Sequence, residues 1–280
     1  MWLFQRKDPL EEEWKALQRQ EERFLKKRKE KSDTLLNQKL AEKVPEKLQN
    51  TLDAAFQKAF TLVFERGTGI IEKTYNRQEL EKDCKISKYA VEIKKTRKSM
   101  KAFQKKAAGS GKKNLLLAGV SGMGLGVLGI GLPDIPLLTG MMLKNIYEIA
   151  LHYGYGYDSE EERYYILLLI QGAVSYGEQV EKINKKADTY IAVGNLPSGY
   201  DKESHIRETA GLLSKELLYM KFLQGIPVVG VIGGAYDAVY MKQVTDYAGL
   251  KYRRRFLTAQ KKNQEMAERR DRGVNRQWDQ

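Results

Sequence analysis

The sequence predicts an all-α fold: a helical bundle with a central glycine-rich apolar hairpin and a long charged helix at its N-terminal end. Apolar residues recur at intervals of three and four along several segments, as they do on the buried face of a helix. No segment shows the apolar–polar alternation that marks a half-buried strand. With 280 residues, the chain is long enough to form one or two domains with a real hydrophobic core.

The composition restricts the classes of function. The chain has 49 Lys and Arg residues against 36 Asp and Glu, a formal charge of +13. This balance favours a polyanionic partner, either a nucleic acid or a membrane rich in acidic lipids. The single cysteine, Cys84, excludes an internal disulfide and fits a reducing compartment. One cysteine and two histidines cannot form a Cys/His zinc site. Carboxylate sites for Mg or Ca stay open, but no EF-hand spacing supports one, and we expect neither a metal nor a cofactor.

The first residues do not predict a secretion signal. Met1 to Phe4 are apolar, but Arg6, Lys7 and Asp8 follow at once and no apolar h-region comes after them. We therefore expect a cytoplasmic protein that associates with a membrane only peripherally.

The chain divides into three parts. Residues 1–44 are dense in charged side chains and poor in large apolar ones, which predicts a charged helical arm with little to bury. Residues 45–257 carry the periodicity of a helical domain, beginning with an amphipathic helix over residues 48–63. Residues 258–280 are basic and have almost nothing to bury, so we expect a disordered tail.

Two further helices of the domain have clear boundaries. Ser159 begins a capping box that Glu162 completes. The helix that follows carries seven consecutive apolar residues, 164–170, which predict burial on all sides. After a loop at 194–200, residues 203–224 form another amphipathic helix.

Residues 85–113 predict one basic amphipathic helix. Eleven Lys and Arg residues face a single acid there, while Ile86, Tyr89, Ile93, Met100 and Phe103 keep a helical spacing. Such a helix is typical of membrane-surface segments, although a lysine-rich outer face of an ordinary domain helix fits the pattern equally well. The residues that we expect to bind an anionic surface are Lys94, Lys95, Arg97, Lys98, Lys101, Lys105, Lys106, Lys112 and Lys113, together with the cluster Lys251, Arg253, Arg254 and Arg255.

The predicted apolar hairpin spans residues 115–143, and Asp134 is the only charged residue in this segment. Residues 115–132 have about the uncharged length of a bilayer-spanning helix. Closely spaced glycines let helices approach each other closely, in membranes and in soluble bundles alike, so hydropathy alone does not place the hairpin in lipid or in the core. The residues that define the hairpin are Gly119, Gly122, Gly126, Gly129, Pro133, Asp134 and Pro136.

Asp134 is interpreted first as a helix N-cap. A carboxylate between two prolines in an apolar segment has to be paired, solvated or protonated. Capping the helix that follows would stabilise it by about 1 kcal/mol. A functional carboxylate is the alternative.

No catalytic motif passes the test of its structural context. The glycine pattern at 124–129 matches a dinucleotide fingerprint, but Pro133 and Pro136 interrupt the helix that this fold requires. Residues 173–177 resemble a nucleophile elbow around Ser175, yet they lie in a helical run rather than after a strand. If the protein is an enzyme, the candidate residues are Asp134, Glu148, His152 and Ser175.

Three stretches of the sequence resemble the EcsC family. They are GIGLPDIPLLTGMMLKNIYEIALHYGY at 129–155, GYDSEEERYYILLLIQGA at 156–173, and QGIPVVGVIGGAYDAVYMKQVTDYAGLKYRRRF at 224–256. The resemblance covers about residues 80–257. The family is bacterial and is named for a gene beside an ABC-transporter operon, so the resemblance implies a helical domain and a link to membrane or transporter biology. It implies no agreed catalytic residues.

The leading hypothesis is a non-enzymatic, membrane-surface-associated protein that is accessory to a membrane or transport process. Its expected partner is an anionic membrane surface or a membrane protein such as an ABC transporter. A hydrolase acting on a lipid or peptide is the alternative. Nucleic-acid binding ranks last, because the chain lacks a helix-turn-helix, RRM or KH signature and its aromatic residues lie among apolar ones.

Overall fold

The computed structural model describes residues 8–30, 46–66, 69–94, 96–106, 135–223 and 235–278. In these ranges every regular element is a helix, which confirms the predicted all-α class. The helices are α1 (Pro9–Lys29), α3 (Glu46–Arg66), α4 (Gly69–Glu72), α5 (Arg77–Lys94), α7 (Ile135–Tyr153), α8 (Glu160–Val174), α9 (Gly177–Val193), α10 (Lys202–Leu223) and α11 (Ala235–Trp278). Residues 97–106 are helical as well.

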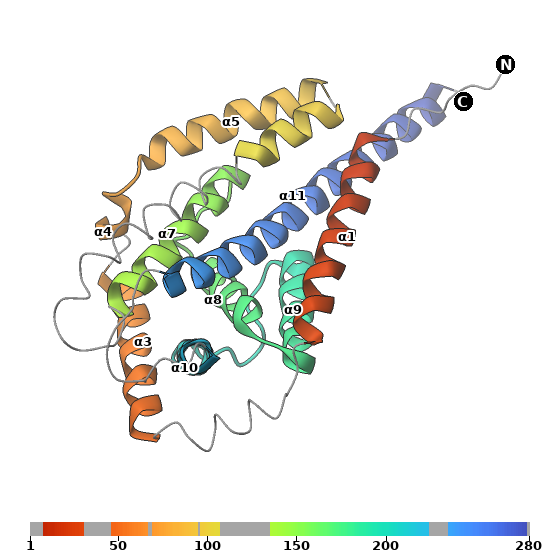
Figure 1. Cartoon of the computed structure of the whole chain (residues 1–280). Coiled ribbons are helices and arrows are strands. Elements are labelled where there is room, and N and C mark those ends of the chain that lie inside the picture. The colour runs from red at the N-terminus through yellow and green to blue at the C-terminus, as the bar shows by residue number, and fades with distance from the viewer. Residues whose placement is uncertain are drawn as a thin grey trace.

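The core is built around α8, which packs against α9, α10 and α11 (Figure 1). The seven apolar residues from Tyr164 to Ile170 are all buried, as their uninterrupted run predicts. On the other side of α11 lies α7, and α3 packs against both α7 and α10. The single hydrophobic core therefore extends across the bundle and includes residues of every long helix described.

The start of α8 confirms half of the predicted capping box. The Ser159 hydroxyl accepts a hydrogen bond from the backbone N–H of Glu162 at 3.2 Å. The Glu162 carboxylate does not complete the box in the way expected. It is buried and accepts hydrogen bonds from Tyr252 and Arg255 of α11, each at 2.6 Å. The Arg255 guanidinium brings a full positive charge that a backbone N–H lacks.

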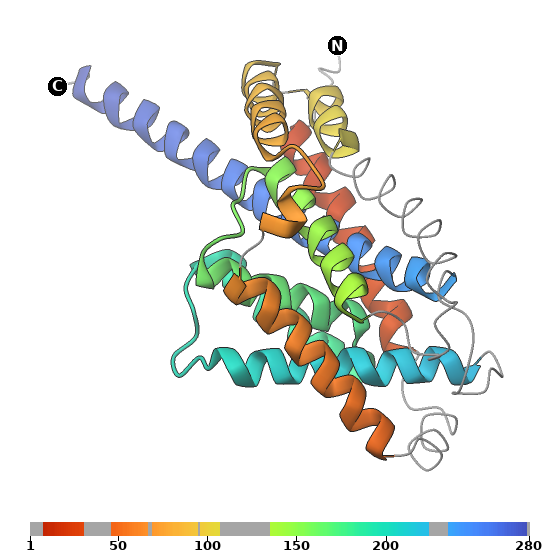
Figure 2. The same cartoon turned by 90° about the vertical axis from the view of Figure 1, so that its left-hand side faces the viewer.

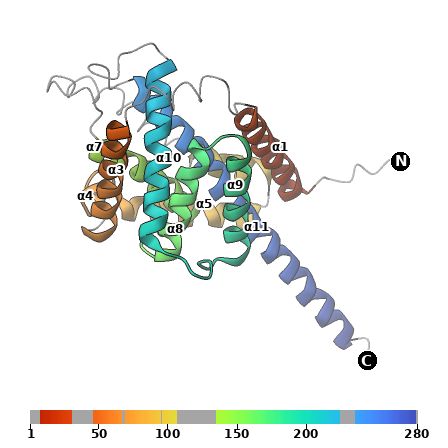
Figure 3. The same ribbon diagram turned by 90° about the horizontal axis from the view of Figure 1, so that it is seen from below.

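The last helix corrects the expectation of a disordered tail. α11 runs for 44 residues and extends beyond the bundle toward the C-terminus, as Figures 2 and 3 show. No proline interrupts residues 258–278, and pairs one turn apart, such as Gln264 with Glu268 at 3.3 Å, support the exposed part. The prediction failed because it considered only burial and neglected helix propensity.

The N-terminal helix has more to bury than predicted. Asp8 caps α1 by accepting from the N–H of Leu10 at 3.0 Å, and Pro9 occupies the first turn. Leu10 and Leu17 are buried, and α1 lies along α11 and α9 (Figure 1). The long charged helix exists, but it forms part of the bundle instead of a solvated arm.

The apolar hairpin is described only in its second half. α7 begins at Ile135, with Pro136 in its first turn, and most of its residues are buried. The glycines at 119, 122, 126 and 129, Pro133 and Asp134 lie outside the described residues, as do residues 224–234, which are also apolar and rich in glycine. The second arm of the predicted hairpin is thus a core helix.

Gly172 of α8 lies directly against a side chain of α11. A Cβ atom added to Gly172 would lie 2.4 Å from the Cε1 atom of Tyr247 on α11. Tyr247 is buried, stacks on Phe24 of α1 with ring centroids 4.9 Å apart, and donates a hydrogen bond to the Asn184 side chain of α9 at 3.0 Å. Glycine at 172 therefore allows one tyrosine to contact three other helices at once.

We predict that Gly172→Ala lowers the free energy of unfolding by about 1–3 kcal/mol, because the Tyr247 ring has no room to move aside. Gly211→Ala is the matched control. It lies within α10, where an added Cβ meets nothing within 4 Å, so it should stabilise the protein by about 0.5–1 kcal/mol. Urea denaturation followed by circular dichroism measures both changes. Equal effects of the two substitutions would contradict the packing argument.

Candidate membrane-binding surface

The predicted basic helix is two helices, which together form a hairpin. The continuous helix expected over residues 85–113 is wrong, since α5 ends at Lys94 and a new helix covers residues 97–106. Thr96 and Ser99 exchange hydrogen bonds at 3.2 and 3.3 Å, each hydroxyl accepting from the other residue's N–H. This reciprocal arrangement caps the second helix in the manner of a capping box. We call α5 and residues 96–106 the basic hairpin; its helices lie side by side in Figure 2.

The inner face of the basic hairpin anchors it to the bundle. Cys84 and Val91 of α5 and Met100 and Phe103 of the second helix are buried. The Phe103 ring lies 4.6 Å from the ring of Phe256 on α11 and 5.5 Å from that of Tyr153 on α7, measured between centroids. This apolar contact fixes which face of the hairpin points outward.

The outer face of α5 exposes a stripe of large apolar side chains. Ile86, Tyr89 and Ile93 are 56, 64 and 61% exposed, and their spacing of three and four places them on one side of the helix. The other exposed large apolar residues of the described chain occur singly on four different helices: Leu62, Leu137, Val193 and Met266. Isolated apolar residues are ordinary on a protein surface, whereas a contiguous stripe marks an interaction site.

Exposed lysines surround this stripe. At 100° per residue, Lys85 and Lys94 lie on its two sides. The exposed lysines of the basic hairpin are Lys82, Lys85, Lys94, Lys98, Lys101, Lys105 and Lys106. Among the residues expected to bind anions, Lys95, Lys112 and Lys113 lie outside the described residues.

Sequence reasoning left open whether the apolar face of this segment meets a membrane or the core, and it missed that Ile86, Tyr89 and Ile93 are exposed while Met100 and Phe103 are buried. Ile86, Tyr89 and Ile93 were grouped with Met100 and Phe103 on one apolar face, but the helix break before residue 97 turns the two sets in opposite directions. The Thr96–Ser99 pair was the available signal for that break, because hydroxyl residues three apart favour a helix start.

The expectation that residues 251–255 form an exposed basic surface is wrong. Lys251 is fully buried, and its ammonium lies 3.1 Å from a Glu21 carboxylate oxygen and 2.7 Å from one of Asp188. Arg253 is 8% exposed and pairs with Glu13 at 2.7 Å. Carboxylates of α1 and α9 therefore neutralise Lys251 and Arg253 inside the bundle. Sequence reasoning missed these partners because they are distant in the sequence.

Arg254 and Arg255 are engaged in the same manner. Arg254 donates to both carboxylate oxygens of Glu21, one of them at 2.8 Å. Arg255 pairs with Glu162 at 2.6 Å and lies over the Tyr155 ring, 3.9 Å from its centroid. Burial raises the pKa of the Glu162 carboxyl, and the neighbouring Arg255 and Tyr252 oppose that shift. These residues hold helices together and are not available to a ligand in this structure.

The residues weighed for catalysis are buried, with one outside the described residues. Ser175 ends α8 at 2% exposure, and within the described chain its Oγ has no hydrogen-bond partner, whereas a nucleophilic serine requires a base in contact. Glu148 and His152 lie one turn apart on α7, at 6 and 8% exposure, and Lys144 approaches Glu148 to 3.9 Å. Asp134 lies outside the described residues.

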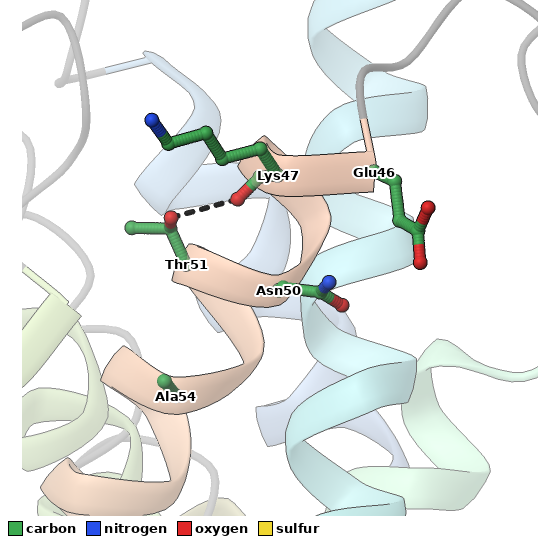
Figure 4. Close-up of a pocket in the computed structure, with 5 residues that line it drawn as sticks. All are labelled: Glu46, Lys47, Asn50, Thr51 and Ala54. Atoms are coloured by element: carbon green, nitrogen blue, oxygen red, sulfur yellow. Dashed lines mark hydrogen bonds between the residues drawn. The ribbon is translucent and has the colours of Figure 1, made fainter.

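The surface hollow in Figure 4 offers no enclosed site. It is lined by Glu46, Lys47, Asn50, Thr51 and Ala54, all exposed residues in the first turns of α3. The Thr51 hydroxyl already donates to the Lys47 carbonyl at 2.7 Å. None of the residues weighed for catalysis lines this hollow.

Over the described ranges, three or more His, Cys, Asp or Glu side chains nowhere gather into a group that could hold a metal ion. In the same ranges, no helix combines the length and the apolar character that crossing a bilayer would require.

Both histidines are buried in ways that disfavour the charged imidazolium. Burial lowers the pKa of His152, with Asp83 opposing and Lys106 reinforcing the shift. Burial lowers the pKa of His205, at the start of α10, to about 4. The His205 ring packs 4.9 Å from that of Tyr164, between centroids.

We predict that His205 makes the protein less stable in acid. Its pKa is about 6.5 when unfolded and about 4 when folded. Between these values the unfolded chain binds a proton that the folded chain does not, so stability falls as the pH drops from about 6.5 to about 4, by about 3 kcal/mol in total. His205→Phe should remove this part of the acid sensitivity and leave the pH dependence above 7 unchanged. Urea denaturation across this pH range tests it; parallel curves for the two proteins would contradict it.

We also predict that Lys251→Met lowers the free energy of unfolding by about 1.5–3 kcal/mol, because it removes the buried charged donor shared by Glu21 and Asp188. Arg254 still pairs with both carboxylates, which limits the loss. Lys101→Met removes the same charge from an exposed position and should change stability by less than about 0.5 kcal/mol. Urea denaturation distinguishes the two. A similar small loss for both would mean that the buried pairs do not hold α1 and α9 to α11.

The sequence was compared with protein-family models, with curated proteins and with solved structures. The model of the EcsC protein family matches residues 11–257. No curated protein and no solved structure matches the chain. The match includes α1, so it begins closer to the N-terminus than the motifs at 129–256 indicated. Because it spans most of the sequence, the chain belongs to the EcsC protein family.

Proposed function

We propose that this chain is a non-enzymatic, peripheral membrane protein of the cytoplasm that binds anionic lipid through the outer face of the basic hairpin. The observation that carries the proposal is the stripe of Ile86, Tyr89 and Ile93, more than half exposed and bordered by exposed lysines. An accessory role in a membrane or transport process follows from this attachment and fits the EcsC resemblance.

The arrangement has the chemistry of an interfacial helix. Such a helix lies in the plane of the membrane, with its apolar side chains at the boundary of headgroups and acyl chains and its cations among the anionic headgroups. Tyrosine suits that boundary because its ring is apolar and its hydroxyl is polar. Each lysine near an anionic surface contributes on the order of 1 kcal/mol, so a set of seven exposed lysines with three apolar anchors supports reversible binding.

Two features favour lipid over the other polyanion considered. Exposed isoleucines gain nothing from contact with phosphate groups, whereas they do gain from transfer into acyl chains. Only eight residues separate the basic hairpin, in the sequence, from the uncharged residues 115–132. Both features support a membrane partner over a nucleic acid.

We predict that the purified full chain sediments with vesicles of phosphatidylcholine and phosphatidylglycerol but not with phosphatidylcholine alone. Added salt should weaken binding, because screening shortens the reach of the exposed charges. Adding duplex DNA at equal salt should not displace the vesicles. Absence of sedimentation at low salt, or preference for the DNA, would refute the proposal.

The apolar stripe provides a second prediction. Replacing both Ile86 and Ile93 with serine should weaken vesicle binding by about thirtyfold, since each loses on the order of 1 kcal/mol of apolar transfer. The matched control replaces Val193 and Met266, which are 62 and 58% exposed on α9 and α11, and should leave binding unchanged. If both pairs weaken binding equally, the stripe is not the contact surface.

A further inference from the structure

The acidic side chains of α1 face basic side chains of α11 across an interface built from ion pairs. Glu13 pairs with Arg253 at 2.7 Å, Glu21 with Lys251 at 3.1 Å and also with Arg254. Toward the projecting end of α11, Glu11 pairs with Lys261 at 3.0 Å. We call Glu11, Glu12, Glu13 and Glu21 the acidic cover.

This interface differs in kind from the core around α8. Glu13 and Glu21 of α1 are as buried as its apolar residues Leu10 and Leu17. Trp14 of α1 lies beneath two cations, 5.3 Å from the Arg254 guanidinium carbon and 4.6 Å from the Lys261 ammonium. α1 is therefore held to α11 largely by ion pairs, because the cations of α11 require an anionic partner.

Another anion can replace the carboxylates of α1 in these ion pairs. A buried ion pair contributes little net stability over other arrangements, while leaving either charge unpaired is costly. A different anion that reaches the cations can replace the carboxylates without leaving the cations unpaired. Lipid phosphate groups meet this requirement because they accept charge-assisted hydrogen bonds from arginine and lysine.

The covered cations continue the surface of the basic hairpin. Arg97 of the hairpin pairs with Glu12 at 3.2 Å and with Glu13 at 3.1 Å. Glu13 holds Arg253 of α11 as well. One carboxylate thus bridges the hairpin and α11, so displacement of α1 would add Arg97, Arg253 and Lys261 to the exposed lysines. Lys251 and Arg254 would lose Glu21 but keep Asp188 of α9.

We propose that residues 251–261 of α11 form a second binding surface for anionic lipid, which α1 covers in this structure and which opens when the basic hairpin meets a strongly anionic membrane. This inference rests on the proposed function, because the hairpin brings the headgroups close to Glu13. α1 then acts as an intramolecular competitor that limits tight binding to membranes with a high density of anionic headgroups.

Hydrogen–deuterium exchange of the full chain on vesicles tests the inference directly. With phosphatidylglycerol vesicles, the amides of α1 should exchange faster than in the free protein, while those of α5 and residues 97–106 become protected. Phosphatidylcholine vesicles should change neither. If the hairpin becomes protected and α1 does not exchange faster, this inference fails and the proposed function stands. If the protein does not bind at all, both fail.

Charge-removing substitutions give an independent readout. Glu13→Gln combined with Glu21→Gln weakens the acidic cover and should tighten binding to phosphatidylglycerol vesicles by at least about fivefold, as one or more cations become available. The matched control combines Glu22→Gln with Glu30→Gln, which makes the same change in charge at an exposed position of α1 and at its exposed C-cap and should produce a much smaller change. Equal tightening in the two variants would show that net charge alone matters and would overturn the proposal. Circular dichroism confirms that each variant is folded, and the exchange experiment on the natural chain remains decisive if one is not.

Discussion

The arrangement of the helices depends on the ion pairs that the basic residues from Lys251 to Arg255 of α11 form with three other helices. Arg255 reaches Glu162 of α8, Lys251 reaches Asp188 of α9, and Lys251, Arg253 and Arg254 reach α1. Three separate helices are thus held to one short segment of a fourth. Lys251 and Arg253 are buried and Arg254 and Arg255 are half-buried, each paired with a specific carboxylate. A shift of α11 by one residue would misplace all of these partners at once, and this favours a single register.

The apolar core and the ion pairs have different roles in this fold. Burial of the run from Tyr164 to Ile170 places α8 in the centre but permits several orientations of the helices around it, since apolar contact is not directional. The paired charges and the close contact of Gly172 with Tyr247 select one of them. The basic hairpin shows a similar division: Phe103 fixes its inner face on Phe256 and Tyr153, and this leaves Ile86, Tyr89 and Ile93 exposed.

Local features of the fold could be predicted from the sequence, and long-range ones could not. The helical class, the Ser159 cap, the loop at 194–200 and the buried run in α8 follow from periodicity and from residue types within one or two turns. The fate of the 251–255 cluster depends on Glu13 and Glu21, which lie 240 and 230 positions away from the cations they bind. A single sequence contains no signal for such pairs. The exposure of the α5 stripe could not be predicted either, because it also depends on long-range contacts: those by which the hairpin packs on α7 and α11.

The length of α11 has a geometric consequence. At 1.5 Å per residue, the part of the helix that follows Leu257 reaches about 30 Å beyond the core. A rod of this length, rooted in the same segment that holds α1, α8 and α9, sets a fixed distance between the folded body and anything attached near Trp278. A partner bound at the far end of α11 would therefore be held away from the folded body.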